Sequence, residues 1–276
     1  MDFLKREAAG TNTVVTGVQN FSLRDILECG QCFRWERLQE DTYEGIVGGR
    51  RRSVCMQGSS LVFYGVAPEE FDAVWLPYFD LERDYGALKQ HLCTDNEMRL
   101  AVEYTPGMRV LRQDAWEALC SFIISQNNNI GRIRGIVKNV CALFGQPLPE
   151  GGSAFPTPQR LAALSLADLQ PLRLGYRAQY LLDAAVMVAE GSLLLQPLYT
   201  MPLEEARAQL RRIRGVGPKV AECALLYGFG RVECMPEDVW IKRALQGLYP
   251  QGFPQEFLPV AGLAQQYLFH YMRTGR

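Results

Sequence analysis

Short apolar runs alternate with polar turn signals over roughly the first third of the chain, which is the pattern of a β-sheet. The runs are separated by turn-forming clusters such as QED, GGRR and QGSS. Because parallel strands need long crossovers, strands this close in sequence predict an antiparallel sheet. A short helix over 22–29, with Ser22 as its N-cap, should precede the strands. The predicted strands are 32–38, 42–47, 52–57 and 60–66.

From about residue 80 the apolar positions recur at helical spacing, and Gly145 and Gly191 follow two of the amphipathic segments as stop signals. The fold class is therefore α+β. We place an N-terminal antiparallel β domain at residues 1–98 and a mainly α-helical region at residues 99–276. The predicted helices are 95–104, 114–126, 130–145, 176–191, 203–214, 218–230, 239–249 and 260–272.

The composition is that of an ordinary globular protein, with 48% hydrophobic and 21% charged residues. No apolar run approaches the roughly 20 residues of a membrane span, and the first residues lack the apolar core of a signal peptide. We therefore expect an intracellular protein with no membrane contact.

Eight cysteines are present, but only Cys29 and Cys32 form a CxxC pair, and no second pair follows at metal-site spacing. Most of the others lie in apolar surroundings, where a free cysteine behaves as a small core residue. The sequence therefore predicts reduced thiols packed in the core, with no metal and no other cofactor.

Charge is distributed unevenly along the chain. Residues 1–100 carry 11 Lys/Arg against 16 Asp/Glu, so the remainder has a basic excess although the net charge is −1. On charge alone, a solvated helix face explains the densest basic stretch better than a nucleic-acid contact does. That stretch contains Arg207, Arg211, Arg212, Arg214 and Lys219.

The segment 203–229 has the pattern of a helix-hairpin-helix, with the turn RGVGP between two amphipathic helices. Gly215 and Gly217 flank Val216, and glycines leave main-chain N–H groups uncovered. Pro218 suits the first turn of the second helix, whose N-terminus attracts a phosphate. An ordinary αα-hairpin is the alternative. We favour a hairpin that binds the DNA backbone through residues 215–217, independently of sequence.

Lys219 and Asp238 have residue types that suit nucleophilic chemistry at a sugar C1′. Lys219 opens a helix, where the positive end of the dipole disfavours an ammonium. Asp238 lies nineteen residues later, before another helical run, and its simplest role is an N-cap. If both faced one cavity, the amine could attack C1′ and the carboxylate could stabilise positive charge on the ribose.

GVGPK followed by MPEDV resembles the helix-hairpin-helix DNA glycosylase superfamily. Within it, four further segments are similar to the 8-oxoguanine DNA glycosylase/AP lyase family, in the right order over nearly the whole chain. The resemblance implies an N-terminal domain like the TATA-binding protein, a helical region of two lobes, and excision of 8-oxoguanine from duplex DNA by a monomer acting without a cofactor. These segments are ECGQCFRW, SQNNNIGRI, LGYRAQY and AGLAQQYLF.

By this resemblance, Lys219 is the nucleophile and Asp238 the catalytic carboxylate. The carbonyl of Gly30 accepts the N7–H of 8-oxoguanine, which guanine lacks. Phe269 and Cys223 contact the two faces of the extruded base. Gln265 then reads its Watson–Crick edge, although QQYLFHYM by itself predicts a buried helix.

Four further positions match family residues that handle the opposite strand. Tyr176 fills the gap left by the extruded base, and Arg132, Arg177 and Asn127 contact the orphaned cytosine. Three successive asparagines also disfavour a helix at 127–129, so we expect a helix break there. An interhelical loop with no further role explains the triplet equally well. Trp240 departs from the family, whose eukaryotic members carry histidine at this position.

Two other functions remain open from the sequence. One is a glycosylase for other damaged bases such as alkylated purines, which shares the hairpin and the aspartate. The other is a noncatalytic module that binds the DNA backbone without distinguishing the lesion. The joint presence of Lys219, Asp238, Gly30 and Phe269 favours the 8-oxoguanine enzyme over both.

Overall fold

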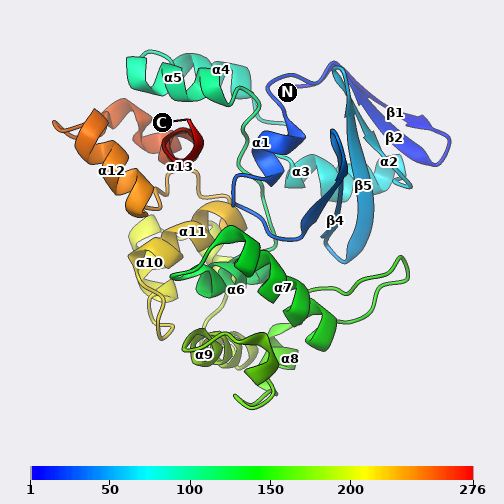
Figure 1. Ribbon diagram of the computed structural model, residues 1–276, viewed down its shortest axis with the longest axis vertical. Helices are drawn as coiled ribbons and strands as arrows, with labels where there is room; N and C mark the ends of the chain where they lie inside the picture. Colours follow the sequence, from blue (N-terminus) through cyan, green and yellow to red (C-terminus); the bar gives the residue numbers. More distant parts are fainter. Residues whose placement is uncertain (1, 276) are drawn as a thin grey trace. The chain divides into compact units, whose positions relative to one another are not determined.

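The computed structural model describes residues 2–275, and its N-terminal part is built around a six-stranded antiparallel sheet (Figure 1). The strand order is β1-β2-β6-β5-β4-β3, so the first and third strands of the chain form the two edges. The strands are β1 Lys5–Ala9, β2 Asn12–Thr16, β3 Trp35–Gln39, β4 Thr42–Val47, β5 Arg50–Gln57 and β6 Ser60–Phe63.

Four of these strands and the antiparallel pairing confirm the prediction, but β1 and β2 were not predicted. The sequence of β1, KREAA, is charged and mostly exposed, so it carries no apolar alternation. Its pairing with β2 is in register from Lys5 opposite Thr16 to Ala9 opposite Asn12. Strand β3 also begins at Trp35 rather than at residue 32, because residues 29–32 form a loop.

One face of the sheet packs on aromatic side chains from the segment that follows β6. The Phe79 ring lies within 6 Å of both the Trp35 and the Phe63 rings, centroid to centroid. The Trp35 indole donates to the Tyr78 hydroxyl at 2.8 Å, which satisfies a polar group that burial would otherwise leave unpaired. Beside this cluster, a Cβ at Gly45 would lie 2.3 Å from the Trp35 ring, so only glycine fits there.

The remaining chain is mainly helical, and the predicted helices are all present within one or two residues, except that α10 ends at Leu210, four residues early. The short helix α1 begins after Ser22, whose hydroxyl accepts from the Asp25 N–H as predicted. The α-helices are α1 Leu23–Leu27, α2 Pro68–Glu70, α3 Leu76–Tyr78, α4 Tyr85–Leu92, α5 Asn96–Tyr104, α6 Ala115–Ser125, α7 Ile130–Phe144, α8 Pro158–Ala162, α9 Arg177–Ala189, α10 Leu203–Leu210, α11 Pro218–Phe229, α12 Val239–Leu248 and α13 Ala261–Thr274. Other helical turns are η1 Phe71–Trp75, η2 Gln170–Leu172, η3 Gln196–Tyr199 and η4 Gln255–Val260.

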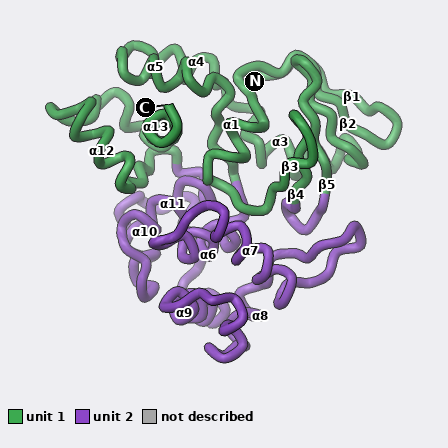
Figure 2. Tube along the Cα trace, viewed as in Figure 1, with its two compact units in different colours: residues 1–45, 52–112, 232–276 green, residues 46–51, 113–231 purple. Residues whose placement is uncertain are grey.

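The chain divides into two compact units (Figure 2). Unit 1 contains residues 1–45, 52–112 and 232–276, so the last helices α12 and α13 group with the sheet. Unit 2 contains residues 46–51 and 113–231, and in it α11 packs on α6. The domain boundary at 98/99 stays a prediction, because grouping by contacts does not establish which segments fold independently.

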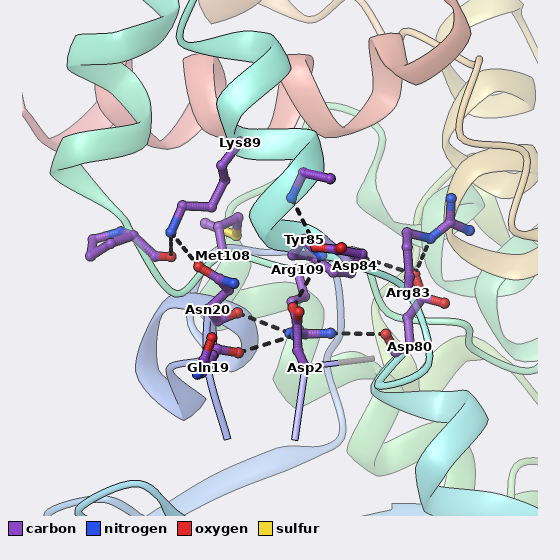
Figure 3. A network of polar contacts seen from close by, with 12 residues as sticks. Asp2, Gln19, Asn20, Asp80, Arg83, Asp84, Tyr85, Lys89, Met108 and Arg109 are labelled. Atoms are coloured by element: carbon purple, nitrogen blue, oxygen red, sulfur yellow. Dashed lines mark hydrogen bonds and ion pairs between the residues drawn. The ribbon is translucent and has the colours of Figure 1, made fainter. Parts of the chain in front are cut away.

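A fully buried arginine organises unit 1 (Figure 3). The Arg109 guanidinium pairs with the Asp2 carboxylate, which also accepts from the Tyr85 N–H at 3.1 Å. The Tyr85 ring lies 4.2 Å below the guanidinium carbon. The remaining donors of Arg109 bind the main-chain carbonyls of Gln19, Asn20 and Asp80. A buried charge is tolerated only when it is this fully paired.

Removing the guanidinium should therefore be costly, because the Asp2 carboxylate would be left buried without its partner. We expect Arg109→Met to lower the free energy of unfolding by about 3–5 kcal/mol, measured by urea denaturation. The matched control is Arg99→Met, because Arg99 forms an exposed pair with Glu103 and should cost about 1 kcal/mol or less. Equal losses in the two variants would contradict the structural role of Arg109.

Candidate active site

The residues singled out from the sequence divide between the two units. Unit 1 carries those expected to read the damaged base, together with the carboxylate, namely Gly30, Asp238, Gln265 and Phe269. Unit 2 carries the lysine, the hairpin and the residues expected at the opposite strand, namely Lys219, Cys223, 215–217, Asn127, Arg132, Tyr176 and Arg177. Each set is described within its own unit.

The hairpin connects α10 and α11 through a turn that glycine permits. Gly215 has a φ of +80°, and a Cβ there would lie 2.2 Å from the Tyr180 ring. Gly217 is different, because a Cβ there would meet nothing within 4 Å. The side chain of Val216 is buried, and its N–H donates to the Ile213 carbonyl at 3.0 Å. Of residues 215–217, the exposed Gly217 at the start of α11 is the best placed to meet a phosphate.

Exposed arginines flank this turn. Arg211, Arg212 and Arg214 are all exposed, whereas Arg207 is bound to Glu222 of α11, with Nη2 and Oε2 3.2 Å apart. The basic stretch of the sequence is therefore split, with one arginine bridging α10 to α11 and three at the surface beside the hairpin. This arrangement favours contact with a polyanion.

Lys219 lies in the first turn of α11 and is half-buried. Its ammonium is 5.7 Å from the centroid of the Phe122 ring, and Phe122 in turn stacks on Tyr227 at 5.1 Å. Cys223, one helical turn later, is buried. The lysine therefore rests on an aromatic wall with its helix dipole directed against it, so the amine is restricted in position and its charged form receives no support from the helix.

The asparagine triplet forms the predicted break between α6 and α7. Asn127 has a φ of +46°, and the Asn129 side chain caps α7 by accepting from the Arg132 N–H at 2.9 Å. The Asn127 amide donates to the Tyr176 hydroxyl at 3.1 Å, and Tyr176 is 46% exposed. The structure thus brings Asn127 and Tyr176 together at the surface of unit 2.

Arg177 and Arg132 differ in their environments. Arg177 is only 6% exposed, and its guanidinium donates to the carbonyls of Gln126 at 2.6 Å, Asn127 at 2.9 Å and Leu174 at 3.0 Å. Arg132 is exposed, and its Nη2 donates to the Arg173 carbonyl at 3.1 Å. The arrangement favours Arg132 as the direct reader of an opposite base, with Arg177 bracing the turn beneath it. Both roles stay predictions.

Asp238 caps α12, as its sequence position predicts. Its carboxylate accepts from the Ile241 N–H at 2.9 Å, so the negative charge lies at the positive end of the helix. Trp240 is the second residue of the helix, and the Arg243 guanidinium lies 5.3 Å from its ring centroid. The position that departs from the family thus presents an indole paired with a cation.

Helix α13 changes from buried to partly exposed at the residues of interest. Residues 261–268 are all buried, including Gln265 at 4%, whereas Phe269 is half-buried. The Arg273 guanidinium lies 5.2 Å from the centroid of the Phe269 ring. Burial, followed by the charges of Arg273 and Arg24, lowers the pKa of His270. Phe269 therefore lies at the edge of the core, where an aromatic face can be reached.

The loop containing Gly30 is held by its neighbours. Gly30 has a φ of +95°, which favours glycine. Cys29 and Cys32 are both buried, as expected of core thiols, and burial raises the pKa of Cys29 to about 11. Gln31, 1% exposed, points inward and bonds main-chain groups of residues 109 and 111.

Four residues were missed by sequence reasoning. Gln31 lies within the motif ECGQCFRW, which suggested no role for it, and Phe122 looks like any apolar helix residue. Arg273 lies near the C-terminus of α13 with no motif around it. Only Arg109, a single charge between apolar residues in MRVL, left a usable signal.

The described residues contain neither a cluster of metal-binding side chains nor a helix suited to a membrane. Across residues 2–275, no group of three or more His, Cys, Asp or Glu side chains could hold a metal ion. Within the same range, no helix has the length and apolar character needed to cross a bilayer.

The chain is similar to characterised DNA repair proteins over nearly its whole length. One family model, "8-oxoguanine DNA glycosylase, N-terminal domain", matches residues 13–119, and another, "HhH-GPD superfamily base excision DNA repair protein", matches residues 120–252. An N-glycosylase/DNA lyase of Arabidopsis thaliana is 30% identical over 270 residues, covering 87% of this chain and 74% of that protein. An N-glycosylase/DNA lyase of Saccharomyces cerevisiae is 30% identical over 249 residues, covering 80% of this chain and 66% of that protein.

A solved structure extends this similarity to three dimensions. It is the 8-oxoguanine glycosylase/lyase of Clostridium acetobutylicum in complex with double-stranded DNA containing cytosine opposite 8-oxoG. The match has a TM-score of 0.95 at 37% identity and covers 100% of this chain and 99% of that chain. The predicted α+β fold class, with the sheet first and the helical region after it, is thereby confirmed.

The two hairpin glycines should respond differently to substitution. Gly215→Ala places a Cβ against the Tyr180 ring in a left-handed backbone, so we expect it to lower the free energy of unfolding by about 1–3 kcal/mol. Gly217→Ala meets no atom within 4 Å and should change stability by about 0.5 kcal/mol or less. Thermal or urea unfolding measures both. Similar losses would show that the hairpin does not have this backbone.

Proposed function

Because this chain belongs to the 8-oxoguanine DNA glycosylase/AP lyase family, we propose that it excises 8-oxoguanine paired with cytosine through a Schiff base on Lys219. The observation that supports this most is the placement of Lys219 itself. It follows the hairpin glycines, opens α11, and rests on the Phe122 ring where its helix offers the ammonium no stabilisation.

In this proposal most of the residues that recognise the damaged base belong to unit 1. The Gly30 carbonyl accepts the N7–H of 8-oxoguanine, whereas the N7 lone pair of guanine would repel it. Phe269 stacks on the extruded base, and Gln265 reads its Watson–Crick edge. Stacking on an aromatic ring is worth about 1–3 kcal/mol and offsets much of the cost of extruding the base. The partly exposed ring of Phe269 at the end of a buried stretch supports this role.

The chemistry divides between the lysine and the aspartate. The neutral amine of Lys219 attacks C1′, the bond from C1′ to the base breaks, and the base leaves with the bonding electrons and takes up a proton. Asp238 stabilises the positive charge that develops on the ribose. The bond from C1′ to the ring oxygen O4′ then breaks as O4′ takes up a proton, which opens the sugar and leaves an iminium between Lys219 and C1′. The iminium acidifies the C2′ hydrogen, and loss of that proton expels the 3′ phosphate, so the strand breaks 3′ to the lesion. Cys223, one turn after the lysine, contacts the base.

The opposite strand is handled by unit 2. Tyr176, exposed and bonded to Asn127, fills the vacated position in the duplex, while Arg132 donates to the acceptors of the orphaned cytosine. Arg177 contacts the same cytosine or holds the 126–127 main chain for those that do. The hairpin turn at residues 215–217 binds a phosphate, chiefly through the N–H of Gly217, because the Val216 N–H already bonds the Ile213 carbonyl. We propose that the enzyme acts as a monomer wherever the cell keeps its DNA, without a metal or other cofactor.

Borohydride trapping tests the nucleophile, because it reduces a Schiff base to a stable amine. The wild-type protein should become covalently linked to an 8-oxoguanine duplex, and Lys219→Gln should not. Lys138→Gln, an exposed lysine on α7, is the control and should be trapped like the wild type. Trapping of Lys219→Gln at the wild-type level would exclude Lys219 as the nucleophile.

Single-turnover excision opposite each of the four bases tests the cytosine preference. We expect the wild type to be fastest opposite cytosine, and Arg132→Ala to reduce its preference over adenine by about tenfold or more. Arg160→Ala, on α8, should leave the preference unchanged. Equal wild-type rates opposite all four bases would refute the proposed reading of cytosine.

A further inference from the structure

We propose that Gln31 is a positioning residue for lesion recognition. It holds the Gly30 carbonyl in the position where that carbonyl accepts the hydrogen bond from N7–H of the base. The inference rests on the proposed function, because it concerns the loop that function assigns to base reading. Gln31 contacts no base in this account. Its side chain is buried and turned away from Gly30 toward the core of unit 1.

The Gln31 amide behaves as the peptide group of a neighbouring strand would. Its Nε2 donates to the Arg109 carbonyl at 2.8 Å, and its Oε1 accepts from the Leu111 N–H at 2.8 Å. A parallel strand opposite residue 110 would make the same two bonds. The same Nε2 also donates to the Ile26 carbonyl at 3.0 Å, at the end of α1. One side chain therefore fixes the loop to α1 on one side and to segment 108–111 on the other.

Segment 108–111, to which Gln31 attaches the Gly30 loop, is itself held in place by buried contacts. The side chain of Arg109 anchors it in the buried cluster with Asp2, and the Val110 N–H donates to the Tyr85 hydroxyl at 3.2 Å (Figure 3). The main chain that receives Gln31 is thus held from both sides. A shift of the loop would require breaking bonds to groups that are themselves immobilised.

The same segment also locates α13. The Tyr267 hydroxyl, fully buried, donates to the Met108 carbonyl at 3.3 Å. Tyr267 lies midway between Gln265 and Phe269, the residues proposed to read and stack on the base. Gln31 and Tyr267 therefore attach two parts of the proposed base site to segment 108–111. Gln31 attaches the loop with the Gly30 carbonyl, and Tyr267 attaches helix α13. All of these residues belong to unit 1.

Only a side-chain amide supplies both bonds. A methionine at position 31 matches the length of glutamine but leaves the Arg109 carbonyl and the Leu111 N–H unpaired in a buried site. A glutamate keeps the acceptor oxygen and loses the donor. In either variant the loop loses this attachment, so the main chain at Gly30 can rotate and its carbonyl can point elsewhere. Gly30 has a φ of +95°, a conformation that glycine adopts readily. The carbonyl then no longer meets N7, although Lys219 belongs to the other unit and is untouched.

Two reactions of the same protein separate positioning from stability. Excision of 8-oxoguanine needs the Gly30 carbonyl, whereas β-elimination at a preformed abasic site opposite cytosine needs the lysine and no base. We expect Gln31→Met and Gln31→Glu to slow single-turnover excision by about tenfold or more while abasic-site cleavage stays within about twofold. Val54→Ala, a buried change in β5, is the control and should change both rates by the same factor.

The outcomes are distinct. A ratio of excision to abasic-site cleavage that falls in both Gln31 variants, and not in Val54→Ala, is the expected result. Equal loss of both reactions, or no change in either, overturns the inference, because Gln31 would then be a structural residue or dispensable. Failure of the wild type to release 8-oxoguanine would instead overturn the proposed function, which this experiment reports separately.

Discussion

The burial of the Arg109 guanidinium is the constraint on which unit 1 depends. A charge with no exposed surface must have every donor satisfied, and Arg109 reaches this only by drawing Asp2 and the main chain of residues 19, 20 and 80 around itself. Because these groups come from three distant stretches of sequence, the Arg109 side chain anchors segment 108–111 to all three of them. The main chain of the same segment accepts hydrogen bonds from Gln31 and Tyr267, so the loop and helix that carry the residues proposed to read the base depend on an ion pair they do not touch.

Unit 2 shows the complementary case, in which the proposed nucleophile lies where helix stability disfavours a lysine. A lysine in the first turn of α11 opposes the helix dipole, and the chain contains many exposed positions where it would cost less. The aromatic contact with Phe122 offsets part of that cost. The opposite arrangement holds at Asp238, where the dipole of α12 and a capping hydrogen bond both favour the carboxylate. The N-terminus of α12 thus stabilises the Asp238 carboxylate, whereas the N-terminus of α11 gives the Lys219 ammonium no stabilisation. An amine must be uncharged to act as a nucleophile.

The sequence predicted those features whose physical cause is local. Ser22 and Asp238 cap helices as predicted, because capping depends on a side chain and the next few N–H groups. Four of the strands were found, whereas β1 and β2 were missed, and the contacts of β1 to the sheet are main-chain bonds that no side-chain pattern records. Motif resemblance located Lys219, Gly30 and Phe269. It gave no sign of Gln31, because the bonding partners of that amide lie about eighty residues away.

The central claim is that the protein distinguishes 8-oxoguanine from other damaged purines, and base release from matched duplexes tests it most directly. Duplexes of one sequence would carry either 8-oxoguanine or 3-methyladenine at the same position, and the released base and the strand break would be measured together under single-turnover conditions. Release of 8-oxoguanine with cleavage of the strand, and none of 3-methyladenine, is predicted. Release of 3-methyladenine with 8-oxoguanine left in place would contradict the account.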